Sequence, residues 1–246
     1  MKVRNRLLNF GDNIIYQDDE WFAFSLDSVL LSNFVSVKLT DKKILDMACG
    51  NAPIPMLLTF RTNASIYGID IQKEVIDLGI QSIHENKMDK QISLDVLDIN
   101  NVEDKFSAEF FDVITCNPPY FKYSNNDNIN LNMNKRISRH EVLVNLDTIV
   151  QKASYLLKNG GTFAMVHRPD RLIEIIDVME KYNIAPKKLQ LCYSKVNSNC
   201  NLILIEGNKN GKSGLKILSP VIVHNDDGSY SEEIRKMFGD DNDVAK

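Results

Sequence analysis

The chain has 246 residues, of which 43% are hydrophobic and 25% are charged. This composition is typical of a soluble globular protein and excludes a disordered chain, a collagen-like repeat and a coiled coil. The 29 Lys and Arg residues are outnumbered by 33 Asp and Glu residues, which excludes a protein that coats nucleic acid by bulk charge but allows a local basic patch.

The first half of the chain alternates between strand-like and helix-like segments. Residues 43–47 are a short apolar run and predict a strand. A helix over 53–60 follows, because proline is tolerated in a first helical turn, where its missing N–H has no partner in any case. Residues 65–70 predict a second strand, and apolar residues at helical spacing between Val75 and Ile83 predict the next helix.

The same alternation continues in the second half. Residues 92–97 and 111–117 predict the third and fourth strands. An apolar stripe over 143–157 predicts a helix that ends at the Asn-Gly-Gly run 159–161, where left-handed backbone costs little. Residues 162–167 predict a fifth strand.

The last elements complete an α/β pattern. Residues 171–182 predict a helix, and 189–196 and 201–206 predict two strands around a polar turn at 197–199, which is typical of a hairpin. We therefore predict a doubly wound, mostly parallel seven-stranded sheet with an antiparallel C-terminal hairpin. Ligands of such sheets lie at the carboxyl ends of the strands, so the residues that follow each strand are the candidate site.

Asp46 lies near the end of the first predicted strand, just before the small-residue turn 48–52. A carboxylate, a tight turn and a helix N-terminus can together bind a nucleotide, because Gly50 lets a ligand approach the backbone and the helix contributes N–H donors. An ordinary strand-to-helix turn explains the residues equally well. The turn lacks the GxGxxG spacing that binds a pyrophosphate, which disfavours a nicotinamide oxidoreductase.

Acidic residues follow the second and third strands. Asp70 lies about 20 residues past the first turn, where an acid can accept hydrogen bonds from both hydroxyls of a ribose or cap the next helix. Asp98, with Asp95 as the less favoured choice, could accept from an adenine amine or be a solvated loop acid.

The sequence Asn117-Pro118-Pro119-Tyr120 follows the fourth strand and is the strongest signal in the chain. Two prolines fix φ and remove two amide donors, so the carbonyls and the asparagine side chain stay free to accept. An aromatic ring comes directly after them. The motif therefore offers two acceptors for an amine and a surface on which a planar ring can stack.

This motif resembles motif IV of the S-adenosylmethionine-dependent amino-methyltransferases, which methylate a planar amine on adenine, guanine, cytosine or a glutamine amide. The turn around Gly50 is similar to their motif I, and Asp70 to the ribose-binding acid of motif II. Motif I usually carries two or three glycines, whereas this chain has Ala48 and Ala52 beside the single Gly50.

A narrower resemblance, to the tRNA1(Val) adenine-37 N6-methyltransferase family, extends over roughly residues 7 to 238. The similar segments are FSLDSVLL (24–31), Gly50-Asn51 with Pro55, GIDIQ (68–72), VHRPDRL (166–172), EGNKNGK (206–212), SPVIV (219–223), GSY (228–230) and Glu232-Glu233. The resemblance implies one class I, Rossmann-like methyltransferase domain over 1–246, with an N-terminal extension (1–40) and a flexible substrate loop (121–139).

The resemblance also implies roles for individual residues. S-adenosylmethionine would be bound by Asp27, Asp46, Ala48, Gly50, Asn51, Asp70, Asp98 and Asn117. The target amine and base would be held by Asn117, Pro118, Pro119 and Tyr120. Basic residues beside the loop after the motif and after the fifth strand would contact tRNA phosphates, although a solvated charged face explains any one of them equally well; they are Lys122, Lys135, Arg136, Arg139, Arg168 and Arg171, of which the last two are the better candidates. We expect no strong general base, and assign His140 and His167 structural or RNA-facing roles.

The segment 124–134 carries six asparagines and few residues that could pack, so we expect a mobile loop that orders as a lid when RNA binds. The cysteines Cys49, Cys116, Cys192 and Cys200 form no CxxC pair, and no export signal or membrane span is evident. We therefore expect a cytoplasmic protein with reduced thiols, no metal and no membrane contact.

Three alternatives remain open. The same motif serves protein glutamine methyltransferases of the release-factor type and rRNA guanine methyltransferases, although the former carry an N-terminal helical domain for which residues 1–42 leave little room. The glycine-poor motif I is also compatible with an inactive cofactor-binding protein that binds RNA or acts as a chaperone. A nicotinamide oxidoreductase is the least favoured reading.

Overall fold

The computed structural model describes residues 2–18, 25–118 and 145–240. The predictions for Pro119, Tyr120, His140 and the loop 121–139, with its Lys122, Lys135, Arg136 and Arg139, lie outside the described residues. Within them, no helix combines the length and the apolar character needed to cross a bilayer.

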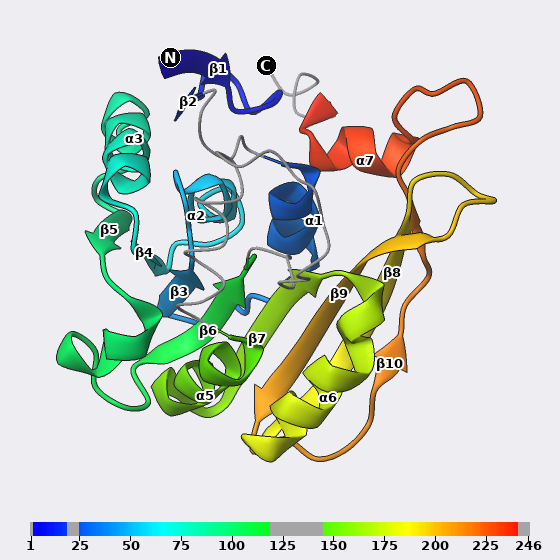
Figure 1. Ribbon diagram of the computed structural model, residues 1–246. Helices are drawn as coiled ribbons and strands as arrows, with labels where there is room; N and C mark the ends of the chain where they lie inside the picture. The colour runs from blue at the N-terminus through cyan, green and yellow to red at the C-terminus, as the bar shows by residue number, and fades with distance from the viewer. Residues whose placement is uncertain (1, 19–24, 119–144, 241–246) are drawn as a thin grey trace, which may run out of the picture.

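The main sheet has nine strands within the described residues, in the order β10-β8-β9-β7-β6-β3-β4-β5, with β11 also paired to β8 (Figure 1). Its strands are β3 (Lys43–Met47), β4 (Ser65–Asp70), β5 (Ile92–Val96), β6 (Phe111–Cys116), β7 (Leu157–His167), β8 (Ile184–Tyr193), β9 (Cys200–Lys209), β10 (Lys216–Ile217) and β11 (Val221–Ile222). The neighbouring strands β7, β6, β3, β4 and β5 run parallel, whereas β9 is antiparallel to both β7 and β8.

The predicted seven-stranded, mostly parallel sheet with an antiparallel C-terminal hairpin is confirmed. The structure adds β10 and β11, each two residues long and parallel to β8 at the edge of the sheet. Two-residue strands are too short to show any hydrophobic periodicity, so sequence patterning gives no sign of them.

Helices cover both faces of the sheet (Figure 1). They are α1 (Leu26–Phe34), α2 (Pro53–Leu58), α3 (Lys73–Glu85), α5 (Leu146–Leu156), α6 (Leu172–Lys181) and α7 (Glu232–Met237), with short 3₁₀ turns η1 (Ile99–Asp104) and η2 (Pro169–Arg171). One core contains buried residues of α1, α2, α3 and α7, and the other contains buried residues of η1, α5 and α6.

Alternate residues of the central strands enter the two cores. In β3, Ile44 belongs to the first core and Leu45 to the second. In β7, Ala164 belongs to the first core, whereas Phe163 and Met165 belong to the second. Strands buried on both faces read as continuous apolar runs, which is why they were predictable from sequence.

The end of α5 differs from the prediction. The helix begins after its N-cap Asn145, whose side chain accepts from the amide of Thr148 at 2.8 Å. It ends at Leu156, and β7 starts at the next residue, so the predicted helix end at 159–161 was wrong. Gly160, with φ +74°, lies in an irregularity of the β6–β7 ladder, where its left-handed backbone bends a strand instead of ending a helix.

The first strand of the C-terminal hairpin also starts earlier than predicted, at Ile184 instead of residue 189. The early part contains Pro186, which cannot donate to a ladder and lies where the β8–β9 register shifts. Because proline is rare inside strands, the sequence pattern did not predict this part of β8.

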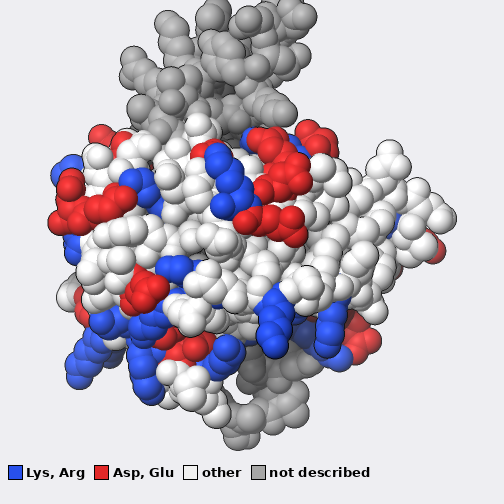
Figure 2. Space-filling model, turned by 90° about the horizontal axis from the view of Figure 1, so that it is seen from below, with Lys and Arg blue, Asp and Glu red and all other residues white. Residues whose placement is uncertain are grey.

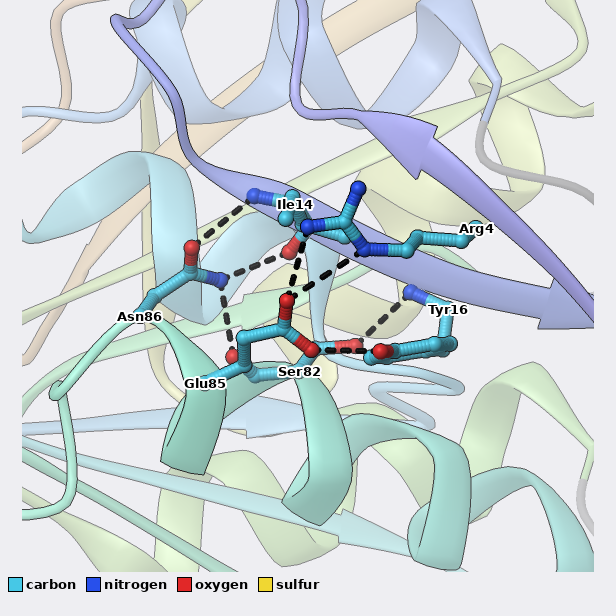
Figure 3. A network of polar contacts seen from close by, with 6 residues as sticks. All are labelled: Arg4, Ile14, Tyr16, Ser82, Glu85 and Asn86. Carbon is cyan, nitrogen blue, oxygen red and sulfur yellow. Dashed lines mark hydrogen bonds and ion pairs between the residues drawn. The ribbon is translucent and has the colours of Figure 1, made fainter.

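The N-terminal 40 residues, predicted only as an extension, contain α1 and an antiparallel hairpin of β1 (Lys2–Arg6) and β2 (Ile14–Asp18). Side chains of α3 hold the free edge of β2 (Figure 3). The Asn86 amide accepts from Ile14 N at 2.9 Å and donates to Ile14 O at 2.6 Å, and Ser82 Oγ accepts from Tyr16 N at 2.9 Å. These bonds replace a neighbouring strand, so the hairpin is fixed to the body of the protein.

An ionic contact adds to this edge. Glu85 binds the Arg4 guanidinium at 2.9 Å and also accepts from the Tyr16 hydroxyl (Figure 3). These two donors lower the pKa of Glu85, the Tyr16 hydroxyl having the larger effect. The pair is exposed, so it contributes little to stability beside the backbone bonds made by Asn86.

Candidate active site

The parallel register brings the predicted strand-end residues to one edge of the sheet. Neighbouring strands β4, β3 and β6 end at Asp70, Met47 and Cys116, and Asn117 follows directly. In Figure 1 the arrowheads of β6 and β7 point to this edge, on the side where α1 and α2 lie. The carboxyl edge is therefore where the sequence placed the candidate site.

The turn after β3 keeps the backbone of a glycine-rich turn although it has one glycine. Ala48, Gly50 and Ala52 all adopt positive φ, at +57°, +55° and +68°. L-residues in the left-handed region cost roughly 1–2 kcal/mol each relative to ordinary backbone. The chain thus retains the conformation of a glycine-rich motif I with alanine at two of its positions.

Asp70 holds this turn in place. One carboxylate oxygen, Oδ2, accepts from Gly50 N at 3.0 Å, and the other, Oδ1, accepts from Gln72 N at 2.9 Å. The residue is only 7% exposed, and its backbone carbonyl accepts from Leu97 N at 3.0 Å. Asp70 therefore joins the turns after β3 and β4.

Burial strongly perturbs the carboxyl of Asp46 at this edge. It is 1% exposed, and its Oδ1 accepts from Thr115 Oγ1 at 2.7 Å. Burial raises the pKa of Asp46 to about 8, and the negative charge of Asp70 adds to the rise, although the Thr115 hydroxyl opposes it. Among the described residues, Asp46 Oδ2 has no hydrogen-bond partner. A buried unpaired carboxylate oxygen is costly, and a cationic group of a ligand would satisfy it.

Close backbone contacts shape the same turn. A side chain on Gly79 of α3 would come within 3.2 Å of the Asn51 backbone and 2.7 Å of a Leu94 methyl. A side chain on Gly68 of β4 would come within 2.8 Å of the Cys49 sulfur. The absence of side chains at these two positions lets α3 and β4 pack directly against the turn.

The remaining predicted cofactor residues have other visible contacts. Asn51 is buried and donates from Nδ2 to Tyr16 O at 2.8 Å, so its side chain ties the turn to the N-terminal hairpin. Asp98 is the N-cap of η1 and accepts from Asn100 N at 2.8 Å. Asp27 lies half-buried in the first turn of α1, close enough to raise the pKa of Cys192 slightly beside the larger effect of burial.

Asn117 and Pro118 are the described part of the predicted amine-binding motif. Asn117 is half-buried and donates from Nδ2 to Ser28 Oγ on α1 at 3.3 Å, and Pro118 is buried. The motif thus begins at the end of β6, next to the edge that holds Asp46 and Asp70, and Ser28 of α1 lies against it.

The predicted RNA-binding arginines follow β7 at the same edge. Arg168 is exposed, whereas Arg171 is held by Glu174 through bonds of 2.9 and 2.5 Å. His167 is 2% exposed, and its Nδ1 accepts from Arg168 N at 2.8 Å. Burial, aided by the charge of Arg171, lowers the pKa of His167 to about 4, so the ring is neutral at pH 7.

The opposite end of the molecule carries charges of both signs. Figure 2 shows this face with Lys and Arg groups interspersed among Asp and Glu groups. Where the parallel strands begin, Lys158 pairs with Asp112 at 2.6 Å and Lys209 pairs with Glu109 at 3.2 Å. Mixed charges of this kind produce no strong field for a polyanion.

Sequence reasoning missed three partners of the site. Thr115, the partner of Asp46, lies on the neighbouring strand β6. Tyr16 and Ser28, the partners of Asn51 and Asn117, lie in the N-terminal part of the chain. The only signal for Ser28 was its place in the FSLDSVLL segment. Within the described residues, no group of three or more His, Cys, Asp or Glu side chains is arranged to hold a metal ion, and all four cysteines are free thiols.

Comparisons of the sequence with known proteins find methyltransferases. The family model "Methyltransferase domain" matches residues 38–218. The tRNA1(Val) (adenine(37)-N6)-methyltransferase of Phocaeicola vulgatus is 25% identical over 203 residues, which cover 82% of this chain and 83% of that protein. The protein of the same name from Cytophaga hutchinsonii is 22% identical over 191 residues, or 78% of this chain and 79% of that protein.

Solved structures share the fold. A predicted O-methyltransferase of Agrobacterium tumefaciens superposes with a TM-score of 0.70 at 17% identity, covering 87% of this chain and 96% of that chain. Geranyl diphosphate C-methyltransferase of Streptomyces coelicolor, solved with S-adenosyl-L-homocysteine, superposes with a TM-score of 0.56 at 13% identity, covering 74% and 76%.

The matched range 38–218 contains the strands β3 to β10 and the acids Asp46 and Asp70, so it spans the whole edge described above. The predicted class of enzyme, a methyltransferase that uses S-adenosylmethionine, is confirmed at the level of the family. The chain belongs to the methyltransferase-domain family.

Proposed function

We propose that the protein transfers a methyl group from S-adenosylmethionine to the N6 amine of an adenine in tRNA, at adenosine 37 of a tRNA1(Val)-like substrate. The observation that carries this proposal is Asn117-Pro118 at the end of β6, beside the edge with Asp46 and Asp70. The names of the relatives that align over most of the chain support the choice of substrate.

The cofactor would lie across the ends of β3, β4 and β5. Asp46 Oδ2 would pair with the ammonium of its methionine part, since this oxygen is buried and has no partner among the described residues. Asp70 is placed next to the Gly50 turn, where the ribose would lie, and Asp98 follows β5, near the adenine. We assign Asp27, Ala48 and Asn51 to the walls of this site: the last two shape the turn, and Asn51 does so through its bond to Tyr16 O.

When bound, S-adenosylmethionine supplies an activated methyl group. The protein orients the acceptor, whose lone pair is otherwise delocalised into the purine ring. Asn117 Oδ1 and the Pro118 carbonyl accept the two amine hydrogens, which turns the lone pair out of the ring plane and toward the methyl. Orientation of this kind lowers an activation barrier by several kcal/mol. Asn117 and Pro118 provide this orientation without a strong base, and water takes the proton that the amine loses after transfer.

The substrate grip comes from residues around the same edge. Tyr120 would stack on the adenine once that base has left its neighbours, a contact worth about 1–3 kcal/mol. Arg168 is exposed directly after β7 and would contact a phosphate, whereas Arg171 would first have to leave Glu174. Lys122, Lys135, Arg136 and Arg139 complete the proposed tRNA contacts from the loop that follows the motif.

The test is methyl transfer from radiolabelled cofactor to three acceptors: unmodified tRNA, rRNA fragments and a release factor. We expect label in tRNA, and in N6-methyladenosine after digestion to nucleosides. Label in a glutamine of the release factor or in rRNA guanine refutes the substrate part of the proposal. Cofactor binding by calorimetry without transfer to any acceptor refutes the enzymatic part.

A further inference from the structure

Helix α1 reaches the amine-binding motif through one hydroxyl. Ser28 is in the first turn of α1 and is 4% exposed. Its Oγ accepts a hydrogen bond from Asn117 Nδ2 at 3.3 Å. The two residues are 89 positions apart in the chain, so this bond joins the N-terminal segment to the end of β6.

The far end of α1 is firmly anchored. Lys188 of β8 donates to Phe34 O at 3.0 Å, and Arg61 donates to Val35 O at 3.0 Å. Cations at a helix C-terminus interact favourably with its free carbonyls. Glu206 of β9, buried at 4% exposure, accepts from Ser36 N at 2.6 Å and pairs with Lys188 at 3.2 Å. Helix α1 therefore cannot slide along its axis without breaking several polar contacts, and Ser28 has a fixed position.

The chemistry of the motif requires one orientation of the Asn117 amide. If Oδ1 faces the target, it accepts an amine hydrogen; if Nδ2 faces the target, two donors oppose each other and the bond is lost. The two orientations occupy almost the same space, so packing alone does not select between them. A hydrogen-bond acceptor on the protein side of the amide does select, because it binds Nδ2 and leaves Oδ1 on the other side.

We propose that Ser28 is a positioning residue that orients the Asn117 amide so that Oδ1 faces the amine to be methylated. This proposal rests on the proposed function, because it assumes that Asn117 receives the amine. Ser28 touches neither the target base nor the methyl group in this scheme, and acts only through Asn117. A separation of 3.3 Å is longer than the usual 2.9–3.0 Å, so the effect of losing the bond is moderate.

The helix supplies a matched control. Ser32 lies one turn further along α1 and is 1% exposed, but its Oγ donates to Val29 O of the same helix at 2.9 Å. Ser28→Ala and Ser32→Ala each remove one buried hydroxyl from α1. Only the first removes an acceptor from Asn117, so the difference between the two variants isolates the proposed role.

The kinetic experiment measures kcat and both KM values with S-adenosylmethionine and tRNA. We expect Ser28→Ala to lower kcat about tenfold, equivalent to about 1.4 kcal/mol, while KM for the cofactor stays within about twofold. Ser28→Thr keeps the acceptor and is expected to restore kcat, and Ser32→Ala to leave it within about twofold. In an Asn117→Ala background, Ser28→Ala should cause no further loss. An equal fall of kcat in both alanine variants, or an additive loss in the double variant, overturns the proposal.

A second readout does not depend on catalysis. The side-chain amide resonances of Asn117, assigned by their loss in Asn117→Ala, should shift in Ser28→Ala and stay in place in Ser32→Ala. Unchanged resonances in Ser28→Ala would overturn the positioning role even if the rate fell. If Ser28→Ala does not fold, Ser28→Cys, which keeps the shape but is a weak acceptor, takes its place. A wild-type protein that methylates no tRNA would refute the proposed function, whereas the resonances would still decide the role of Ser28.

Discussion

Replacing the buried carboxyl of Asp46 with an amide should make the protein more stable while it removes cofactor binding. Asp46 is 1% exposed, and burial raises its pKa from 3.8 to about 8. Between these two values the unfolded chain releases the proton and the folded protein keeps it, so stability falls as pH rises. Each pH unit in this window costs about 1.4 kcal/mol, and the loss is complete above about pH 8.

The size of the effect at pH 7 follows from this slope. With a pKa of 3.8 in the unfolded chain, about three pH units of this window lie below pH 7. At pH 7 the buried carboxyl therefore destabilises the folded protein by about 4 kcal/mol. Asparagine cannot ionise and can still accept from Thr115 Oγ1, but it places an NH₂ group where Asp46 Oδ2 has no partner. An unsatisfied buried donor costs about 1–3 kcal/mol. We therefore expect Asp46→Asn to be more stable than the wild type by about 1–3 kcal/mol at pH 7.

Urea unfolding of both proteins at pH 5, 6, 7 and 8 is the assay. The stability difference between Asp46→Asn and the wild type should grow with pH up to about pH 8, and calorimetry should find no cofactor binding by the variant. Thr115→Val is the companion variant, because losing the hydroxyl that stabilises the carboxylate should raise the pKa of Asp46 further. A difference that does not change with pH, or a variant less stable than the wild type at pH 8, would refute the electrostatic reasoning.

Four further variants test the scaffold of the protein. Ala48→Gly should raise the free energy of unfolding by about 0.5–1 kcal/mol, because Ala48 has a strained φ of +57°. As a control, Ala153→Gly in α5 should lower the free energy of unfolding by at least about 1 kcal/mol. Thermal unfolding that ranks the two variants the other way would contradict backbone strain at Ala48. Gly79→Ala should weaken cofactor binding several-fold in calorimetry, because the added methyl group would press on the turn after β3. An unchanged affinity would show that α3 can move away from the turn. Asn86→Ala loses both bonds to Ile14 and should cost about 1–3 kcal/mol in urea unfolding; a change under about 0.5 kcal/mol would mean that the hairpin is held by other contacts.

The central sheet was predictable because its strands are buried on both faces. The runs at 43–47, 65–70 and 111–117 have buried apolar residues at their centres, and all three end at the same edge of the sheet. An acidic residue at the end of a strand can therefore be recognised from its position in this pattern. The positions of Asp46 and Asp70 at the edge follow from this reasoning alone.

The N-terminal part was not predictable in the same way. Strand β2 is completed by side chains, because Asn86 and Ser82 supply hydrogen bonds that a neighbouring strand would otherwise make. Such bonds join residues about 70 positions apart and leave no periodic trace in the sequence. Helix α1 is buried along most of its length, so its residues do not show the one-sided polarity of an amphipathic helix.

The partners of the site depend on three-dimensional proximity. Thr115 reaches Asp46 because β3 and β6 are neighbours in the sheet, an order that sequence spacing does not reveal. Ser28 reaches Asn117 because α1 is anchored by Lys188 at its other end. The chemistry of a site could thus be inferred from its own residues, whereas the groups that tune and orient them required the fold.

The most direct test of the central claim is to map the methylated nucleotide in a defined tRNA1(Val) transcript by mass spectrometry, with the wild type and Asn117→Ala compared in single turnover. We predict N6-methyladenosine at adenosine 37 with the wild type and a rate at least about 100-fold lower with the variant. Methylation of another base or another atom, or a variant as fast as the wild type, would contradict an enzyme that holds its target amine with Asn117.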